Sequence, residues 1–252
     1  MITSATNINI TQAKKLLQKK YRDEYGLFVI EGAKLAKEAL DRNVDIKYFI
    51  LDVAANESCA SLANESGMPV FSVQSNVFKS LTDSVTPQGI IAVAAKPETT
   101  LRSPKGKCLI LEKLQDPTNV GAILRTAAAT GYNEAYLIDC ADAFSPKSIR
   151  CGMSSQFCLD IFEGDFEEIF DAVSKTCAVV CADMDGKDIF DENTKIPAKH
   201  ALLLGSEGKG VSAAAKQKSD FTVSIPMQNK MESLNVSVSA GILMYVLTSK
   251  CK

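Results

Sequence analysis

The sequence has a single histidine, His200, and no C-x-x-C pair among its eight cysteines. A zinc site built from cysteine and histidine would have one imidazole and no paired thiols, so we expect no bound metal. Several cysteines, Cys108, Cys177 and Cys181 among them, lie in apolar runs, where cysteine behaves as a small hydrophobic residue. We therefore expect reduced, mostly structural thiols and a location in the reducing cytoplasm.

Long apolar runs and a cationic leader are also missing. No apolar run approaches the roughly 18 residues of a membrane helix, and residues 1–7 have no cationic start followed by an apolar stretch. We expect neither a membrane span nor a secretory signal. The 28 Lys and Arg residues and 30 Asp and Glu residues nearly cancel, which excludes a polybasic tail but permits a local basic surface.

The chain of 252 residues, 46% of them hydrophobic, is long enough for one or two hydrophobic cores. A polar stretch with two prolines and a glycine separates two apolar strands near its middle. We predict an N-terminal domain at 1–96, a linker at 97–106 and a C-terminal domain at 107–252.

Short apolar runs alternate with helical segments in both parts, which predicts an α/β fold. In the second part the runs are apolar on both faces, which predicts a largely parallel sheet covered on both sides. A final apolar helix at 236–247 should pack into the core or against another subunit. The predicted strands are 28–30, 46–51, 70–73, 90–94, 108–111, 135–138, 178–182, 201–204 and 221–225.

The N-terminal segment carries a cluster of positive charge. A basic helix is predicted at 11–21, and residues 1–22 hold five cations and no acid. The predicted linker region adds three more cations. A solvated helix face and a surface that binds phosphates both remain open. These cations are Lys14, Lys15, Lys19, Lys20 and Arg22, followed by Arg102, Lys105 and Lys107.

Three segments of the second part carry polar residues at strand ends. After strand 108–111, Asp116, Thr118 and Asn119 can cap the following helix. Arg125 interrupts that alanine-rich helix, either as a structural ion-pair partner or as a phosphate ligand.

Strand 201–204 leads into a glycine-rich turn that lets the backbone approach a ligand closely. Glu207 in this turn is either solvated or aimed at a ligand. Ser233 and Asn235 stand at the entrance to the last helix, where capping alone would explain them. Gly208-x-Gly210-x-x-Ala213 approximates a dinucleotide fingerprint, but the acid expected about 20 residues further on is missing, so an oxidoreductase is a weak alternative.

In their order and spacing, the three segments resemble the signature motifs of the SpoU (TrmH-like) branch of the SPOUT RNA methyltransferases. The first motif is Asp116-Pro117-x-Asn119-x-Gly121-Ala122-x-x-Arg125-Thr126-Ala127, the second is Leu204-Gly205-x-Glu207-Gly208-x-Gly210, and the third joins Ile225-Pro226-Met227 to Glu232-Ser233-Leu234-Asn235-Val236-Ser237. The first part resembles the ribosomal-protein-like substrate-binding domain of the family in Lys19-Lys20-x-Arg22, Gly26-x-Phe28-x-Ile30-Glu31-Gly32 and Glu38-Ala39-Leu40.

The resemblance implies a homodimeric 2′-O-ribose methyltransferase that uses S-adenosylmethionine, with a deep C-terminal trefoil knot and an active site formed across the dimer. Its substrate would be RNA, with ribosomal RNA ahead of transfer RNA; a non-catalytic RNA-binding or ribosome-assembly protein is the alternative. By position in the motifs, the backbone around Leu204, Gly205, Ile225, Met227 and Leu234 would hold the cofactor. The polar catalytic cluster would be Asn119, Arg125, Glu207, Ser233 and Asn235.

Within that cluster we expect Arg125 to clamp a substrate phosphate, because a guanidinium with a pKa above about 12 is a poor base at pH 7. Glu207 or an ordered water would accept the proton of the 2′-hydroxyl. Asn119, Ser233 and Asn235 would orient the ribose and the knot loops. Asn229 stands where many relatives have glycine, and asparagine tolerates the left-handed backbone region that such a loop requires.

Overall fold

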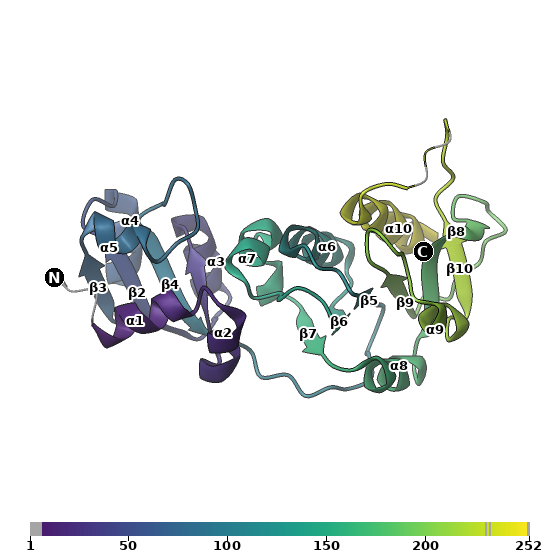
Figure 1. Ribbon diagram of the computed structural model, residues 1–252, viewed down its shortest axis with the longest axis horizontal. Coiled ribbons are helices and arrows are strands. Elements are labelled where there is room, and N and C mark those ends of the chain that lie inside the picture. The colour runs from purple at the N-terminus through teal and green to yellow at the C-terminus, as the bar shows by residue number, and fades with distance from the viewer. Residues whose placement is uncertain (1–6, 230, 232, 251–252) are drawn as a thin grey trace. The chain divides into compact units, whose positions relative to one another are not determined.

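The computed structural model describes residues 7–229, 231 and 233–250, which form two compact units (Figure 1). The N-terminal unit extends to Glu98 and also includes Asp142–Phe157. The second unit comprises Thr99–Ala141 and the chain from Cys158 onward. Residues 142–157 therefore pack with the N-terminal unit although the chain places them inside the predicted C-terminal domain. The predicted boundaries near 96 and 107 stay a prediction.

The N-terminal unit is built on a four-stranded sheet in the order β1–β4–β2–β3. The strand β4 lies antiparallel to β1 and β2, and β2 is parallel to β3. All four strands predicted for this part are present. The strands are β1 (Leu27–Glu31), β2 (Ile46–Asp52), β3 (Val70–Val73) and β4 (Ile90–Ala95). The helices are α1 (Ile8–Lys15), α2 (Lys19–Tyr25), α3 (Ala33–Asp41), α4 (Glu57–Glu65), α5 (Ser75–Lys79), α7 (Pro146–Gly152) and the 3-10 turn η1 (Ser155–Phe157).

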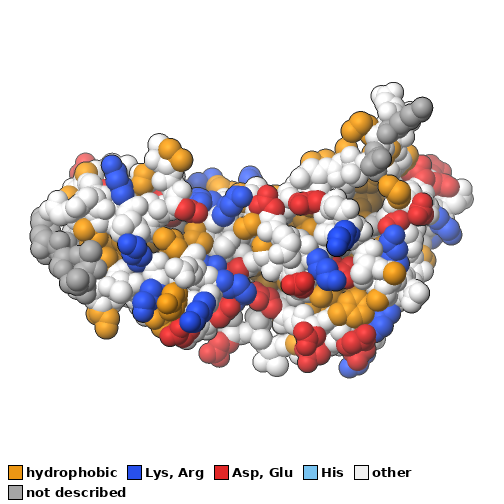
Figure 2. Space-filling view, in the orientation of Figure 1, with side chains coloured by type: hydrophobic (Ala, Val, Ile, Leu, Met, Phe, Trp, Pro, Cys, Tyr) orange, Lys and Arg blue, Asp and Glu red, His pale blue; other side chains and the backbone are white. Residues whose placement is uncertain are grey.

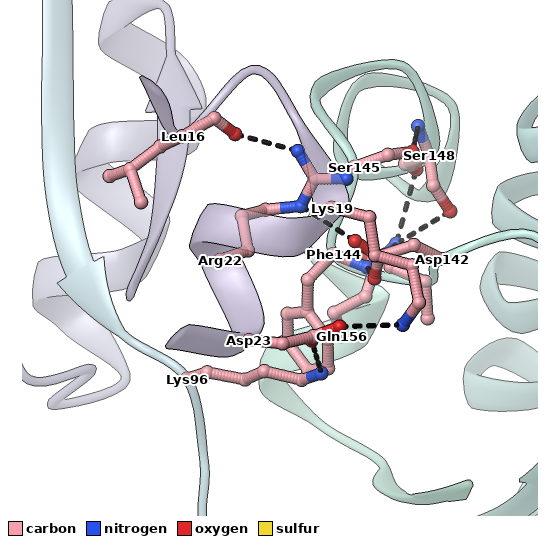
Figure 3. Close-up of polar contacts among 11 residues, drawn as sticks. Leu16, Lys19, Arg22, Asp23, Lys96, Asp142, Phe144, Ser145, Ser148 and Gln156 are labelled. Atoms are coloured by element: carbon pink, nitrogen blue, oxygen red, sulfur yellow. Dashed lines mark hydrogen bonds and ion pairs between the residues drawn. The ribbon is translucent and has the colours of Figure 1, made fainter. Parts of the chain in front are cut away.

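The single basic helix predicted at 11–21 is wrong, because the segment forms two helices with a break after Leu16. The Leu16 carbonyl oxygen accepts a hydrogen bond from a guanidinium nitrogen of Arg22 at 2.6 Å (Figure 3). In a continuous helix that carbonyl would instead accept from a backbone N–H four residues on. Arg22 is only 3% exposed and also donates to Asp142 at 2.6 Å. Arg22 therefore leaves the predicted basic surface and becomes part of the interior.

The second unit contains a six-stranded sheet in the order β10–β8–β9–β5–β6–β7, and every neighbouring pair in it is parallel. The strands are β5 (Cys108–Glu112), β6 (Glu134–Ile138), β7 (Asp160–Glu163), β8 (Ala178–Asp188), β9 (His200–Leu204) and β10 (Phe221–Ser224). The helices are α6 (Pro117–Thr130), α8 (Phe166–Ser174), α9 (Ala213–Gln217) and α10 (Val236–Lys250). Strand β7 was not predicted, because it is short and has an exposed acid at each end.

Both faces of this sheet are covered, as the sequence predicts. Alternate strand residues such as Ile110 and Tyr136 pack with Ile169 and Phe170 of α8. The residues between them on the strands are equally buried, and α6 and α10, which contact each other, lie on that other side (Figure 1). The central strands β5, β6 and β9 are buried along their whole length. None of the described helices is long and apolar enough to cross a membrane.

Two of the three linker cations hold the second unit together instead of forming a surface for phosphates. Arg102 donates to the buried carboxylate of Glu134 and, at 2.5 Å, to Asp160. Lys107 donates to the Thr130 carbonyl at 2.7 Å and to the Thr248 hydroxyl at 2.8 Å. The partners of Arg102 and Lys107 lie far away in the chain. A count of cations in the segment therefore gave more free positive charge than the folded protein has.

His200 is fully buried at the start of β9 and bonded through both ring nitrogens. Its Nδ1 lies 2.8 Å from the Pro197 carbonyl oxygen, which can only accept, so Nδ1 carries the proton. Its Nε2 then accepts from the Tyr132 hydroxyl at 2.7 Å. Burial lowers the pKa of His200 below its ordinary value, and the nearby cation of Lys107 lowers the pKa further. The imidazole is therefore neutral in the folded protein.

We expect the free energy of unfolding to fall as the pH drops below about 6.5, because His200 gains a proton in the unfolded chain but stays neutral where it is buried. The loss can reach about 1.4 kcal/mol per pH unit between the two pKa values. In His200→Gln this part of the pH dependence should disappear. Urea unfolding of both proteins between pH 8 and pH 5 measures it, and parallel curves for the two proteins would contradict the assignment.

Candidate functional site

The three motif segments follow β5, β9 and β10, three strands of one parallel sheet. The carboxyl ends of parallel strands meet at the same edge of a sheet, and this edge is where open α/β sheets bind ligands. Residues as far apart in the chain as Asn119 and Asn235, 116 residues, are thereby brought to one place. The sheet topology alone thus groups the predicted site.

Helix α6 begins where the first motif requires it. The Asp116 side chain accepts from the Thr118 N–H at 2.9 Å, and Pro117 occupies the first turn, where its missing N–H costs nothing. The helix ends at Gly131, whose φ of 77° is left-handed. These two ends place Asn119 in the first turn of α6, where it is 8% exposed.

Asn119 joins all three motifs through its side-chain amide. Its Nδ2 donates to Oε1 of Glu207 in the glycine-rich turn. Its Oδ1 accepts from Nδ2 of Asn235 at 3.2 Å. Asn235 in turn accepts from the Ser237 N–H at 2.9 Å and so caps α10. We name Asn119, Glu207 and Asn235 the amide–carboxylate cluster; it fixes a carboxylate beside the glycine-rich turn.

Arg125 and Ser233, the other two residues predicted to be catalytic, lie outside this cluster. Arg125 follows Asn119 by six residues, which on a helix is about 9 Å along the axis and roughly 120° around it. Its side chain is exposed, and the side chains of Arg125 and Ser233 form no hydrogen bond with another described residue. A single chain therefore assembles three of the five predicted side chains.

The glycine-rich turn closes on itself immediately after β9. The Ser206 N–H donates to the Gly210 carbonyl at 3.1 Å, and the Gly210 N–H donates back at 2.8 Å. A side chain at Gly205 would overlap the backbone of Gly210 and Val211, so only glycine fits there. A Cβ at Gly208 would meet no atom within 4 Å. The turn thus depends on one glycine for space, and it presents Glu207 next to Asn119.

The residues predicted to hold a cofactor follow the same strands. Leu204, the last residue of β9, is 2% exposed, and Leu234 is 38% exposed. The half-buried residues among them are Gly205, Ile225 and Met227. Glu232 of the third motif lies outside the described residues. Asn229 has a φ of 56°, which confirms the expected left-handed conformation.

One carboxylate that supports the site was not identified by the sequence analysis. Glu112, the last residue of β5, is 2% exposed, and its Oε2 accepts from the Ser212 N–H at 2.9 Å. Ser212 caps α9, so Glu112 ties the segment after the glycine-rich turn to the strand that precedes α6. An acid at the end of a fully apolar strand was the available signal. Within the described parts of the chain, no group of three or more His, Cys, Asp or Glu side chains could hold a metal ion.

Replacing Gly205 with alanine should lower the free energy of unfolding by about 1–3 kcal/mol, because the added methyl group forces the backbone of Gly210 and Val211 apart. Gly208→Ala in the same turn is the matched control and should change it by less than about 0.5 kcal/mol. Urea unfolding of the two variants provides the comparison, and equal stabilities would contradict the close packing described for Gly205.

Two family models match the chain. The model described as the SpoU rRNA Methylase family matches residues 106–245, and the model described as the MRM3-like substrate binding domain matches residues 7–92. The first match contains every residue of the amide–carboxylate cluster and covers more than half of the chain. The second match contains the sheet of the N-terminal unit except the last residues of β4.

Similar proteins extend over nearly the whole chain. The 23S rRNA (guanosine(2553)-2′-O)-methyltransferase RlmP of Bacillus subtilis is 32% identical over 247 residues, which cover 98% of each protein. Among solved structures, an AdoMet-bound rRNA methyltransferase from Sinorhizobium meliloti is 28% identical with a TM-score of 0.84 and covers 98% of this chain and 97% of that chain. An RNA 2′-O ribose methyltransferase is 30% identical with a TM-score of 0.83 and covers 99% and 98%. The chain therefore belongs to the SpoU rRNA methylase family, has the mixed α/β fold of the SPOUT methyltransferases, and is an RNA methyltransferase.

Proposed function

We propose that this protein transfers the methyl group of S-adenosylmethionine to a ribose 2′-hydroxyl of ribosomal RNA. The observation that carries the proposal is the amide–carboxylate cluster, in which one residue from each signature motif meets beside the glycine-rich turn. The names of the similar proteins support the substrate and the cofactor. Family membership excludes the oxidoreductase alternative left open by Gly208-x-Gly210-x-x-Ala213.

The residues assigned to the cofactor suit S-adenosylmethionine. Leu204, Gly205, Ile225, Met227 and Leu234 offer apolar side chains and backbone polar groups, and none of them carries a charge. Such a set can bury an adenine ring and hydrogen-bond its edges. When bound, S-adenosylmethionine supplies an electrophilic methyl group.

The amide–carboxylate cluster prepares the proton acceptor. A ribose 2′-hydroxyl is a weak nucleophile until its proton is removed or shared. Asn119 donates to one carboxylate oxygen of Glu207 and leaves the other free of that bond. We assign Glu207 as the group that accepts the proton, directly or through water, and Asn119 and Asn235 as the groups that orient it. Ser233 lies two residues before Asn235 and would orient the ribose.

Arg125 would hold the phosphate next to the reacting ribose, since a guanidinium binds phosphate oxygens through two parallel hydrogen bonds. Arg125 lies apart from the amide–carboxylate cluster within one chain. We propose that the protein is a homodimer, which would explain this separation. Helix α10 packs on α6 and is largely apolar, and two of its large hydrophobic side chains are exposed: Val238 is 50% exposed and Tyr245 61% exposed. Pairing of two copies through these helices would cover that surface and bring Arg125 to the partner subunit's cluster.

RNA contact by the N-terminal unit is supported by exposed lysines next to aromatic rings. Lys14 and Lys20 are exposed, and Lys15 lies 5.1 Å from the ring centre of Tyr21. The rings of Tyr21 and Tyr25 stack at 5.9 Å, the arrangement on which unpaired bases can stack. Figure 2 shows Lys and Arg side chains with hydrophobic ones among them over α1 and α2, and acidic side chains nearby. Lys19 forms an ion pair with Asp23 at 3.2 Å and contributes less free charge.

Two further expectations stay proposals. A trefoil knot at the carboxyl-terminal end rests on membership of the SpoU family. A cytoplasmic location rests only on the sequence, which has eight cysteines and no paired spacing.

Deleting the gene should remove one 2′-O-methylated nucleoside from ribosomal RNA and leave transfer RNA unchanged. Mass-spectrometric nucleoside analysis of both RNA classes measures this. Wild-type protein should restore the nucleoside, whereas Arg125→Ala should not, because the substrate phosphate loses its clamp. The affinity of Arg125→Ala for S-adenosylmethionine should stay within about twofold, since Arg125 is not among the cofactor residues.

Each alternative predicts a different result. A nucleoside missing from transfer RNA would move the substrate to that class. Restoration by Arg125→Ala would favour a non-catalytic RNA-binding role, and loss of its affinity for S-adenosylmethionine would contradict the clamp.

Replacing Lys14 and Lys20 with glutamine should weaken RNA binding and reduce the slope of log K against log salt concentration by roughly 1.5, because two phosphate contacts are lost. Lys37→Gln combined with Lys47→Gln is the matched control, since both lysines are exposed and paired with acids on the same unit. Filter binding at several salt concentrations measures the slopes. Identical slopes for the two double variants would remove α1 and α2 from the RNA-binding surface.

A further inference from the structure

Residues 142–157 lie between β6 and β7 in the chain, yet they pack with the N-terminal unit. We call them the docked segment. Three N-terminal motifs carried the resemblance to the substrate-binding domain, and each supplies one side chain that bonds to this segment. The three pairs are Arg22 with Asp142, Glu31 with Arg150, and Glu38 with Ser154.

The pair of Arg22 and Asp142 is the most buried of the three. Each side chain is 4% exposed, and their atoms approach to 2.6 Å (Figure 3). The guanidinium is further satisfied by the Leu16 carbonyl at 2.6 Å, and Asp142 accepts the Phe144 N–H at 2.8 Å. A buried charge left without its partner is strongly destabilising, so this pair holds the docked segment firmly.

The other two pairs hold the far end of the docked segment. Arg150 lies 3.4 Å from the buried carboxylate of Glu31 and 2.7 Å from Asp83. The Ser154 hydroxyl donates to Glu38 of α3. Met153 and Ser154 have left-handed φ values of 46° and 70°, which non-glycine residues keep only where surrounding contacts enforce them.

Aromatic side chains of the docked segment pack against β1. The ring of Phe28 lies edge-on to Phe144, with ring centres 5.2 Å apart, and 6.3 Å from the ring centre of Phe157. Gln156 Nε2 donates to the carbonyls of Ala143 and Ser148, both at 3.1 Å, and so closes the segment on itself. The docked segment is therefore folded and packed as part of the N-terminal unit.

The chain immediately before the docked segment supports the first motif. The Ala141 N–H donates to the Leu114 carbonyl at 2.7 Å, and Gln115 donates to the Asp139 carbonyl at 2.7 Å. Leu114 and Gln115 lead directly to Asp116, which caps α6. Asp142 follows Ala141 in the chain, so one peptide bond and one backbone hydrogen bond join the buried ion pair to Leu114, which precedes the helix that carries Asn119 and Arg125.

We propose that Arg22 and Asp142 are positioning residues for methyl transfer. By fixing Asp142, the pair restrains the neighbouring Ala141 and its hydrogen bond to the Leu114 carbonyl, and thereby the start of α6 and the Asn119 amide. The proposal rests on the proposed function, because the reaction it concerns is RNA methylation. It assigns Arg22, Glu31 and Glu38 of the N-terminal motifs to intramolecular contacts and leaves the exposed lysines to contact RNA.

The test uses the full-length protein with Arg22→Gln, Asp142→Asn and the double variant. Each variant should show a kcat at least tenfold lower, with the affinity for S-adenosylmethionine within twofold of wild type and the KM for RNA within threefold. Hydrogen exchange should become faster in residues 142–157 and also in 113–119. The kcat of the double variant should be no lower than that of the more impaired single variant, because both substitutions remove the same interaction. Arg22→Lys keeps the charge and should recover part of the kcat.

Lys37→Gln, which removes an exposed ion pair with Asp41 on the same unit, is the control and should leave kcat and exchange unchanged. Faster exchange at 142–157 with no change at 113–119 or in kcat would overturn the proposal. A rise in the KM for RNA alone would also overturn it, since Arg22 would then act on substrate.

If Arg22→Gln and Asp142→Asn do not fold, Glu38→Ala and Ser154→Ala each remove the hydrogen bond between the Ser154 hydroxyl and the Glu38 carboxylate. The same changes in kcat and in exchange are then expected of these two variants. The exchange measurement needs no RNA. It therefore separates failure of this proposal from failure of the proposed function, which would show as a wild-type protein that does not methylate ribosomal RNA.

Discussion

The side-chain amide of Asn119 is the interaction on which the site depends. It is nearly buried, and a buried amide must have both its donor and its acceptor satisfied. Asn119 meets this requirement with Glu207 on one side and Asn235 on the other, two residues that belong to segments following different strands. The amide can occupy that place only because Asp116 starts α6 one turn earlier and Gly205 leaves room for the turn that carries Glu207.

A parallel sheet with both faces covered supplies the rigid frame for this interaction. Its central strands are buried along their whole length, so their register cannot shift without exposing apolar side chains. This fixed register also fixes the positions of the polar groups at the carboxyl ends of the strands. Glu112 extends it, because a carboxylate within β5 holds the start of α9 and thus the far side of the glycine-rich turn.

Positive charge serves two separate purposes in this protein. Arg22, Arg102 and Arg150 are bonded to acids within their own units, where the planar guanidinium can satisfy several acceptors together. Lys14 of α1 and Lys20 of α2 remain exposed, and a lysine ammonium is strongly hydrated, which suits contact with a phosphate backbone. A nearly neutral total charge is therefore compatible with an RNA enzyme, since many of its cations and acids neutralise each other in pairs.

The sequence by itself determined the α/β class, nine of the ten strands found in the described residues, the family and the left-handed loop residue Asn229, because each depends on local periodicity or on motif spacing. The tertiary structure decided the break after Leu16, the short strand β7 and the structural use of Arg102 and Lys107. It also decided that residues 142–157 join the N-terminal unit and that Arg125 stands apart from Asn119 within one chain. The physical reason is distance along the chain: Arg22 and Asp142 are 120 residues apart, and no local pattern names a partner that only the folded backbone brings near.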